Sequence, residues 1–162
     1  MYNQIIQWSV FVLSLISLLI ILKKSSLIGD CLYVYLITVF FSSFIPVILI
    51  EQHYYEHPVR FLSQYFSSAV LFDYLAFPTL NVLFNLTTKR SKLVGVLAQA
   101  VLYSALMTTV EFILERYTEL IKYYSWTWMH SFVTLIAFFL FVRLLMSLIR
   151  TADERERSRG VG

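Results

Sequence analysis

Long apolar runs, separated by short polar segments, fill most of this chain. The runs extend over about 5–22, 29–50, 67–87, 93–114 and 126–149. A helix needs about 20 apolar residues to cross the hydrocarbon core of a bilayer, so each run has the length of one crossing. We therefore predict an all-α integral membrane bundle of five transmembrane helices, formed by residues 1–150.

Two segments fall outside the predicted crossings. Residues 59–66 mix Arg60 and Gln64 with apolar side chains over too short a length to span, so we expect an interfacial helix or a loop there. Residues 151–162 carry six charged side chains and almost no apolar ones. Such a composition cannot bury a core, and it predicts a charged, flexible cytoplasmic tail.

Basic residues predict the orientation of the bundle. One set of alternate loops and helix ends holds ten: Lys23, Lys24, Lys89, Arg90, Lys92, Arg143, Arg150, Arg155, Arg157 and Arg159. The other set holds the remaining three of the 13: Arg60, Arg116 and Lys122. Because cytoplasmic loops are enriched in lysine and arginine, we expect the N-terminus outside and the C-terminus in the cytoplasm.

Composition supports a membrane location and limits the functions available. Of the 162 residues 59% are hydrophobic and 14% charged, against about 45–50% and about 25% in soluble domains. Little room remains for a soluble catalytic domain. The net charge of +3 comes from residues at the ends of apolar runs, which indicates topology signals and anionic lipid contact rather than nucleic acid. The single cysteine, Cys31, excludes a disulfide within one chain.

Three ionisable residues lie inside the predicted crossings, near their outer ends: Asp73, Glu111 and His130. Charged groups in lipid cost a few kcal/mol each and usually face the bundle interior. At a rise of about 1.5 Å per residue the three have similar depths, so contact between them is feasible. Two acids and an imidazole in one pocket could carry protons, bind a cation or act as acid and base.

Further polar residues lie on the same helices as this predicted cluster. Ser104 and Thr108 share a face with Glu111, and Thr134 shares one with His130. Such residues could line a polar pocket. Alternatively, each acid simply hydrogen-bonds to a neighbouring helix and holds the packing together. No nucleophile or zinc motif accompanies the cluster, so we assign no catalytic residue and no cofactor.

Pro78 adds a mechanical feature to the third run. It lacks an amide hydrogen, so the carbonyl of Tyr74, beside Asp73, loses its helical donor. Asn81 lies one turn further on. A kinked helix with a free carbonyl beside an acid could line a transport pathway, although membrane helices also tolerate proline without any such role.

Two other polar groupings are weaker candidates. His53 and His57, with Glu51 and Glu56, offer imidazoles and carboxylates to a transition metal, but solvated loop residues explain them equally simply. Near the cytoplasmic ends of the second and fifth runs lie Asp30 and Arg143. Either they pair, or the arginine extends to the interface.

The stretch Asp73–Asn81 (DYLAFPTLN), Glu111 and the stretch Ile121–Trp128 (IKYYSWTW) together resemble a family of small uncharacterised multi-spanning membrane proteins of bacilli and clostridia. The resemblance extends over most of the chain. It implies a bacterial plasma membrane location and assigns no functional residues.

Three functions fit the sequence. The first is a structural or interaction component of a membrane assembly, with another membrane protein or a second copy as partner. The second is a small proton- or cation-linked transporter or channel that uses Asp73 and Glu111. The third, an intramembrane enzyme that uses His130, ranks last. Convergence of the ionisable groups on a water-accessible cavity would favour the second, and a dry, mutually bonded cluster the first.

Overall fold

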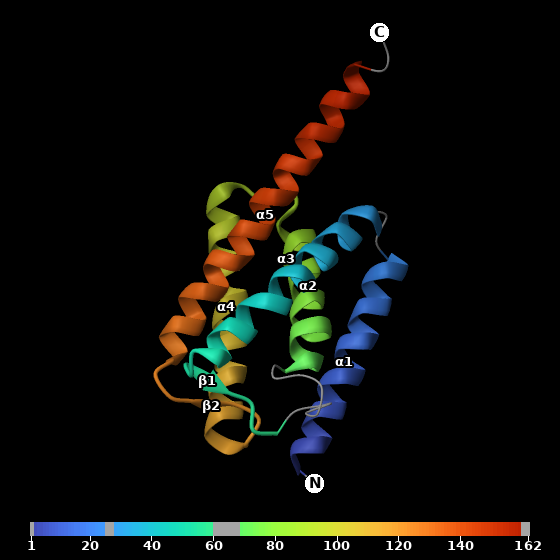
Figure 1. The fold of residues 1–162 in the computed structure, drawn as a ribbon. Coiled ribbons are helices and arrows are strands. Elements are labelled where there is room, and N and C mark those ends of the chain that lie inside the picture. The colour runs from blue at the N-terminus through green and yellow to red at the C-terminus, as the bar shows by residue number, and fades with distance from the viewer. Residues whose placement is uncertain (1, 25–27, 60–68, 160–162) are drawn as a thin grey trace.

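The computed structural model describes residues 2–24, 28–59 and 69–159, which form five α-helices and two very short strands (Figure 1). The elements, in chain order, are α1 (Tyr2–Lys24), α2 (Ile28–Glu51), β1 (Tyr55–Glu56), η1 (Phe72–Ala76), α3 (Phe77–Thr88), α4 (Leu93–Tyr117), β2 (Lys122–Tyr123) and α5 (Trp128–Arg159). η1 is a π-helical turn that leads directly into α3. Most of predicted segment 59–66 lies outside the described residues.

Four helices are long and apolar enough to cross a membrane. The qualifying stretches are Asn3–Ile21, Ile28–Glu51, Leu93–Tyr117 and Trp128–Glu156. They match four of the five predicted crossings and confirm a helical, multi-pass membrane protein. The apolar surface agrees, because many large hydrophobic side chains on these helices are exposed, as lipid-facing residues are.

α3 differs from the other four helices. Together η1 and α3 run from Phe72 to Thr88, about 25 Å at the usual rise, somewhat less than the hydrocarbon core of about 30 Å. Eight of the 12 residues of α3 are buried, including Asn81 and Asn85. This helix is therefore the centre of the bundle, and its neighbours shield its polar side chains from lipid.

Two apolar clusters pack around α3. The first joins Phe77 and Phe84 of α3 to side chains of α4 and to Phe139 of α5. The second joins Val82 to α2 and to Val142 of α5. Two faces of one short helix thus fix the positions of α2, α4 and α5, which explains how a bundle with so much exposed apolar surface has a defined interior.

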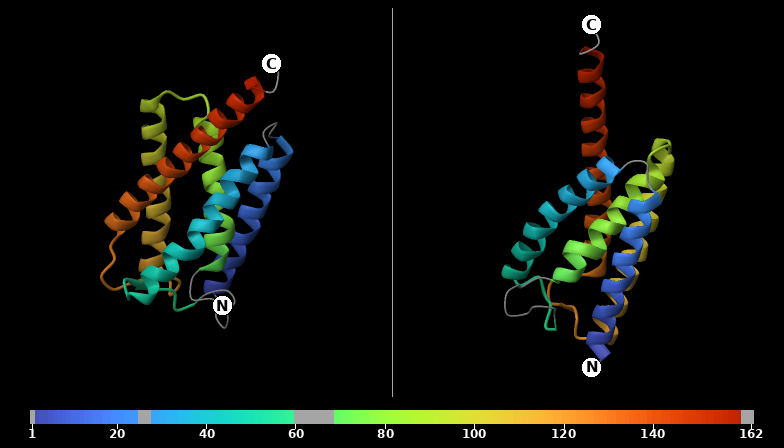
Figure 2. Two further views of the ribbon diagram at one scale, coloured as in Figure 1. Left: turned by 45° about the horizontal axis from the view of Figure 1, so that its top comes forward. Right: turned by 90° about the vertical axis from the view of Figure 1, so that its right-hand side faces the viewer.

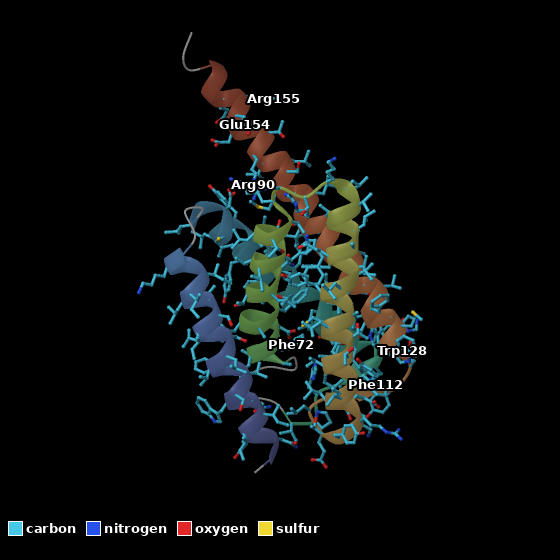
Figure 3. All side chains as sticks on the ribbon, turned by 180° about the vertical axis from the view of Figure 1, so that it is seen from behind. Phe72, Arg90, Phe112, Trp128, Glu154 and Arg155 are labelled. Carbon is cyan, nitrogen blue, oxygen red and sulfur yellow. The ribbon has the colours of Figure 1, made fainter. Side chains whose placement is uncertain are left out.

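Successive helices run in opposite directions, so the bundle has two distinct ends (Figures 1 and 2). At one end, which we call the strand end, β1 pairs antiparallel with β2 near the N-terminus. We call the opposite end, from which α5 projects, the basic end. Figure 3 shows Arg90 there, with Glu154 and Arg155 beyond it on α5, whereas Phe72, Phe112 and Trp128 lie toward the strand end.

The charged segment after residue 150 is helical as far as Arg159, which the sequence analysis did not predict. α5 continues through the charged segment as far as Arg159 instead of ending near Ile149. Glutamate and arginine are good helix formers, so this segment can be helical without being packed against the bundle. The charged segment has few apolar side chains to pack against the bundle, but its residues still favour a helical backbone. Residues 160–162 lie outside the described residues.

Candidate functional site

A cavity of about 200 Å³ lies inside the strand end of the bundle. Residues of α1, α2, η1, α4 and α5 line it, together with the segments that carry β1 and β2. Most of its wall is apolar, with side chains that include Ile6, Val10, Ile45, Leu49, Leu114 and Phe138. Since a water molecule takes up about 30 Å³ in the liquid, the cavity has room for several waters or one small organic molecule.

Asp73 and Glu111 both line this cavity, from helices that are far apart in the sequence. Asp73 is 7% exposed, and Glu111 is half-buried one and a half turns before the end of α4. The two acids of the predicted cluster therefore converge on one space. Thr134 of α5 lines the same cavity.

The position of Asp73 depends on hydroxyl groups of α2. The Ser42 hydroxyl donates to the carbonyl of Asp73 (2.7 Å), and the Tyr35 hydroxyl donates to the carbonyl of Tyr74 (2.6 Å). These carbonyls lie five and four residues before Pro78, which has no amide hydrogen to offer either of them. Side chains of α2 thus supply the donors that proline lacks, and they hold the π-helical turn with Asp73 at the cavity wall.

Glu111 is the end of a chain of hydrogen bonds. The Tyr123 hydroxyl donates to Glu111 Oε2 (3.1 Å) and lies 3.3 Å from the Ser131 hydroxyl oxygen. Trp126 Nε1 donates to the same Ser131 oxygen (2.8 Å). The Tyr123 hydroxyl has one hydrogen, which it gives to Glu111, so the Ser131 hydroxyl donates to Tyr123 and each donor in this chain points toward the acid.

Two tyrosines flank the acids. Burial raises the pKa of the Tyr55 phenol, and the nearby carboxylates of Asp73 and Glu111 raise that pKa further. Burial also raises the pKa of Tyr123, with a second contribution from Glu111. Both phenols therefore stay protonated at neutral pH, so Tyr123 remains a donor to Glu111.

Loop contacts close the strand end beside the cavity. His57 is buried and its Nδ1 donates to the carbonyl of Leu120 (2.8 Å). The amide of Val59 donates to the carbonyl of Glu119 (3.2 Å), and Gln7 Nε2 of α1 donates to the carbonyl of Val59 (3.2 Å). The segment after α2 is thus bound to the segment before α5 and to α1, which gives the cavity a built cap.

His130 is the main correction to the predicted cluster. Its side chain is exposed, its Nδ1 lies 2.7 Å from the Thr127 hydroxyl, and its ring packs beside Trp126 at 5.2 Å. The next residue, Ser131, faces the interior instead. Successive residues of a helix are about 100° apart, so the inward face of α5 lies one residue further along the chain than the sequence analysis assumed.

The two weak candidates for metal ligands, His53 and His57, have different surroundings. Among the described residues, no three His, Cys, Asp or Glu side chains converge closely enough to hold a metal ion. His53 is exposed, with a left-handed backbone (φ 57°), whereas His57 is buried in the cap. Glu56 accepts a hydrogen bond from Tyr124 (2.6 Å) and pairs with Lys122 (3.7 Å).

Several polar groups lie deeper in the bundle. Asn81 is fully buried and its Oδ1 accepts a hydrogen bond from Asn85 Nδ2 (3.2 Å). Ser104 and Thr108 are also buried, and within the described part of the chain their hydroxyl oxygens and Asn81 Nδ2 have no hydrogen-bond partner. These residues belong to the packed interior around α3 rather than to the cavity wall.

At the basic end, Asp30 pairs with residues other than Arg143, the partner named in one of the two alternatives for these residues. Its Oδ2 lies 2.9 Å from Arg150 Nη2 and 3.4 Å from Lys89 Nζ. Arg143 instead donates from Nη2 to the carbonyls of Thr88 (3.3 Å) and Lys89 (3.4 Å). A cation near the last carbonyls of a helix is favourable, so Arg143 stabilises the end of α3.

Sequence reasoning missed Tyr55 and Tyr123 as cavity residues. They are cross-strand partners in the β1–β2 pair, and no local pattern predicts so short a pair. One usable signal was present, because alternating helices place the segments after α2 and before α5 at the same end of the bundle.

Comparison with protein families, curated proteins and solved structures finds no match to this chain. Function is therefore inferred from the cavity and its side chains.

Proposed function

We propose that this protein binds a positively charged species, a proton or a cation, in the outer half of a cell membrane, and that it acts as a small proton- or cation-linked transporter. The observation that supports this proposal most is the shared cavity of Asp73 and Glu111. Carboxylates are costly beside apolar walls. A bound positive charge offsets this cost.

The proposed topology has five crossings, with the strand end outside. α3 and its π-helical turn form the fifth crossing, since their neighbours cover the polar side chains that would otherwise face lipid. Lys89 and Arg150 meet at Asp30 at the basic end, and Arg90 and Lys92 lie in the same turn between α3 and α4 as Lys89, which favours the cytoplasmic side for that end. The resemblance to membrane proteins of bacilli and clostridia supports a plasma membrane location.

A role as an interaction component is the second candidate, and α1 supports it. None of the residues in the apolar stretch Asn3–Ile21 of α1 is buried against the rest of the described chain. A helix so loosely covered has a free face for another membrane protein or a second copy. An additional copy would also help a five-helix protein to enclose a path. The intramembrane enzyme finds less support, because the one histidine it would use is outside the cavity.

Flux measurements test the transport proposal. Wild-type protein in liposomes should give ion or proton flux that depends on pH, and Glu111→Gln and Asp73→Asn should each abolish it. Glutamine and asparagine keep the shape and hydrogen bonding of the acids but cannot release a proton. The matched control is Glu51→Gln, an exposed acid at the end of α2, which should leave the flux unchanged.

Two results would contradict the proposal. Wild-type flux that survives both substitutions in one chain would remove these carboxylates from transport. Absence of flux from wild-type protein that is folded and correctly inserted would favour the interaction role instead.

A further inference from the structure

We propose that the cavity at the strand end recognises a small organic ammonium ion, with aromatic rings around its alkyl groups and Asp73 and Glu111 balancing its charge. This inference rests on the proposed function and specifies the chemical class of the cation. Three features of the cavity lead to it: its aromatic wall, its two acids and its size.

The aromatic wall is made by Tyr55, Tyr123 and Trp126, which all line the cavity. The Tyr55 ring lies 6.4 Å from that of Tyr123 and 5.9 Å from that of Trp126, at interplanar angles of 79° and 62°. These are the distances and angles of edge-to-face packing, so the three rings form one aromatic cluster in the cavity wall. A cation over the face of such a ring is attracted to it, and aromatic side chains are the usual means by which proteins bind quaternary ammonium groups.

The aromatic side chains are held in place rather than loosely exposed. Backbone pairing between the two strands holds Tyr55 and Tyr123. Hydrogen bonds from the Trp126 indole to Ser131 and from the Trp126 amide to the carbonyl of Tyr54 (3.1 Å) fix the tryptophan. A prearranged wall loses little conformational freedom when a ligand binds, which favours affinity.

The acids and the apolar wall select among cations. A small inorganic cation such as Ca²⁺ needs six to eight oxygen ligands, and Mg²⁺ retains much of its water. Here two carboxylates face a mainly apolar space, a poor replacement for a hydration shell. An alkylammonium ion is weakly hydrated, and its alkyl groups suit the apolar side chains while its charge suits the acids.

The volume limits the size of the ligand. A cavity of about 150 Å³ lined by apolar side chains accommodates benzene, and this cavity measures about 200 Å³. Tetramethylammonium, which has fewer heavy atoms than benzene, is therefore a suitable probe. Its uncharged isostere, neopentane, has the same shape with carbon in place of the charged nitrogen and is the matched control.

Trp126 supplies an intrinsic reporter for binding. The chain has three tryptophans, and the other two, Trp8 and Trp128, are 56% and 50% exposed. Changing those two to phenylalanine leaves Trp126 as the source of tryptophan fluorescence. In detergent, titration of this protein with tetramethylammonium should change the fluorescence and saturate, with an affinity at least about tenfold higher than for neopentane.

Two substitutions of Tyr55 separate the ring from its hydroxyl. Tyr55→Phe should keep the affinity for the ammonium ion within about twofold, whereas Tyr55→Leu should lower it about tenfold through loss of the cation–π contact. Asp73→Asn combined with Glu111→Gln should remove the preference for the cation over its isostere. If Tyr55→Leu does not fold, the comparison of the two probes on the parent protein still tests whether the cavity prefers the ammonium ion.

Equal affinities for the two probes, or no saturable binding of the ammonium ion, would overturn this inference. So would unchanged affinity in folded Tyr55→Leu. If the carboxylates still control proton flux in liposomes, only the organic ligand is wrong and the proposed function survives. Loss of that dependence on the carboxylates refutes the proposed function separately.

Discussion

We expect Phe139→Ala to lower the free energy of unfolding in detergent by about 3–5 kcal/mol, since a large buried side chain is removed and a cavity remains. Phe139 is fully buried at the point where α3, α4 and α5 meet. The centroid of its ring lies 5.0 Å from the ring centroid of Phe84, 5.9 Å from that of Phe77 and 6.0 Å from that of Tyr103. Thermal or denaturant unfolding followed by circular dichroism measures the change.

The matched control is Leu144→Ala on the same helix. Leu144 is 59% exposed and faces the surroundings of the bundle, so its truncation should change the free energy of unfolding by no more than about 0.5 kcal/mol. Equal losses from the two substitutions would mean that α5 does not pack on α3 and α4 in the arrangement described here.

The crossings were predictable because lipid imposes a simple requirement. A helix must be long and apolar to span, and four predicted runs meet that requirement in the structure. The run around Asp73 is different, since its polar residues are tolerated only through coverage by other helices. Its central place in the bundle depends on tertiary packing, which hydropathy along one segment does not contain.

The candidate site was predictable only in part, for a similar reason. Asp73 and Glu111 were identified because ionisable groups in an apolar helix need an explanation. The prediction that His130 belongs to the cluster was wrong. Ser131 faces the interior instead, because the rotation of α5 depends on its contacts with α4. His57 entered the site through a loop contact with Leu120, 63 residues away, which no local pattern indicates.

The second large effect that we expect is one-sided labelling in intact cells. Cysteine at Gln52, at the strand end, should react fully with a membrane-impermeant thiol reagent, whereas cysteine at Ser158 should not react. The concentration of basic residues at the opposite end is the reason. The experiment uses a Cys31→Ala background, which removes the single native thiol.

Permeabilised cells provide the control for this labelling, because both introduced cysteines should react once the reagent reaches both sides. Labelling at residue 158 in intact cells would reverse the proposed orientation. It would also place the acid-lined cavity on the cytoplasmic side of the membrane.

The proposal that Asp73 and Glu111 act as one unit toward a positive charge is tested most directly by a double-mutant cycle. The free energy of unfolding is measured at pH 8 for wild type, Asp73→Asn, Glu111→Gln and the double variant. Like charges in one cavity interact, so we expect a coupling energy of at least about 1 kcal/mol. Asp30→Asn with Glu111→Gln, at opposite ends of the bundle, should add within about 0.5 kcal/mol. Additivity of Asp73→Asn and Glu111→Gln within that same limit would contradict the shared site.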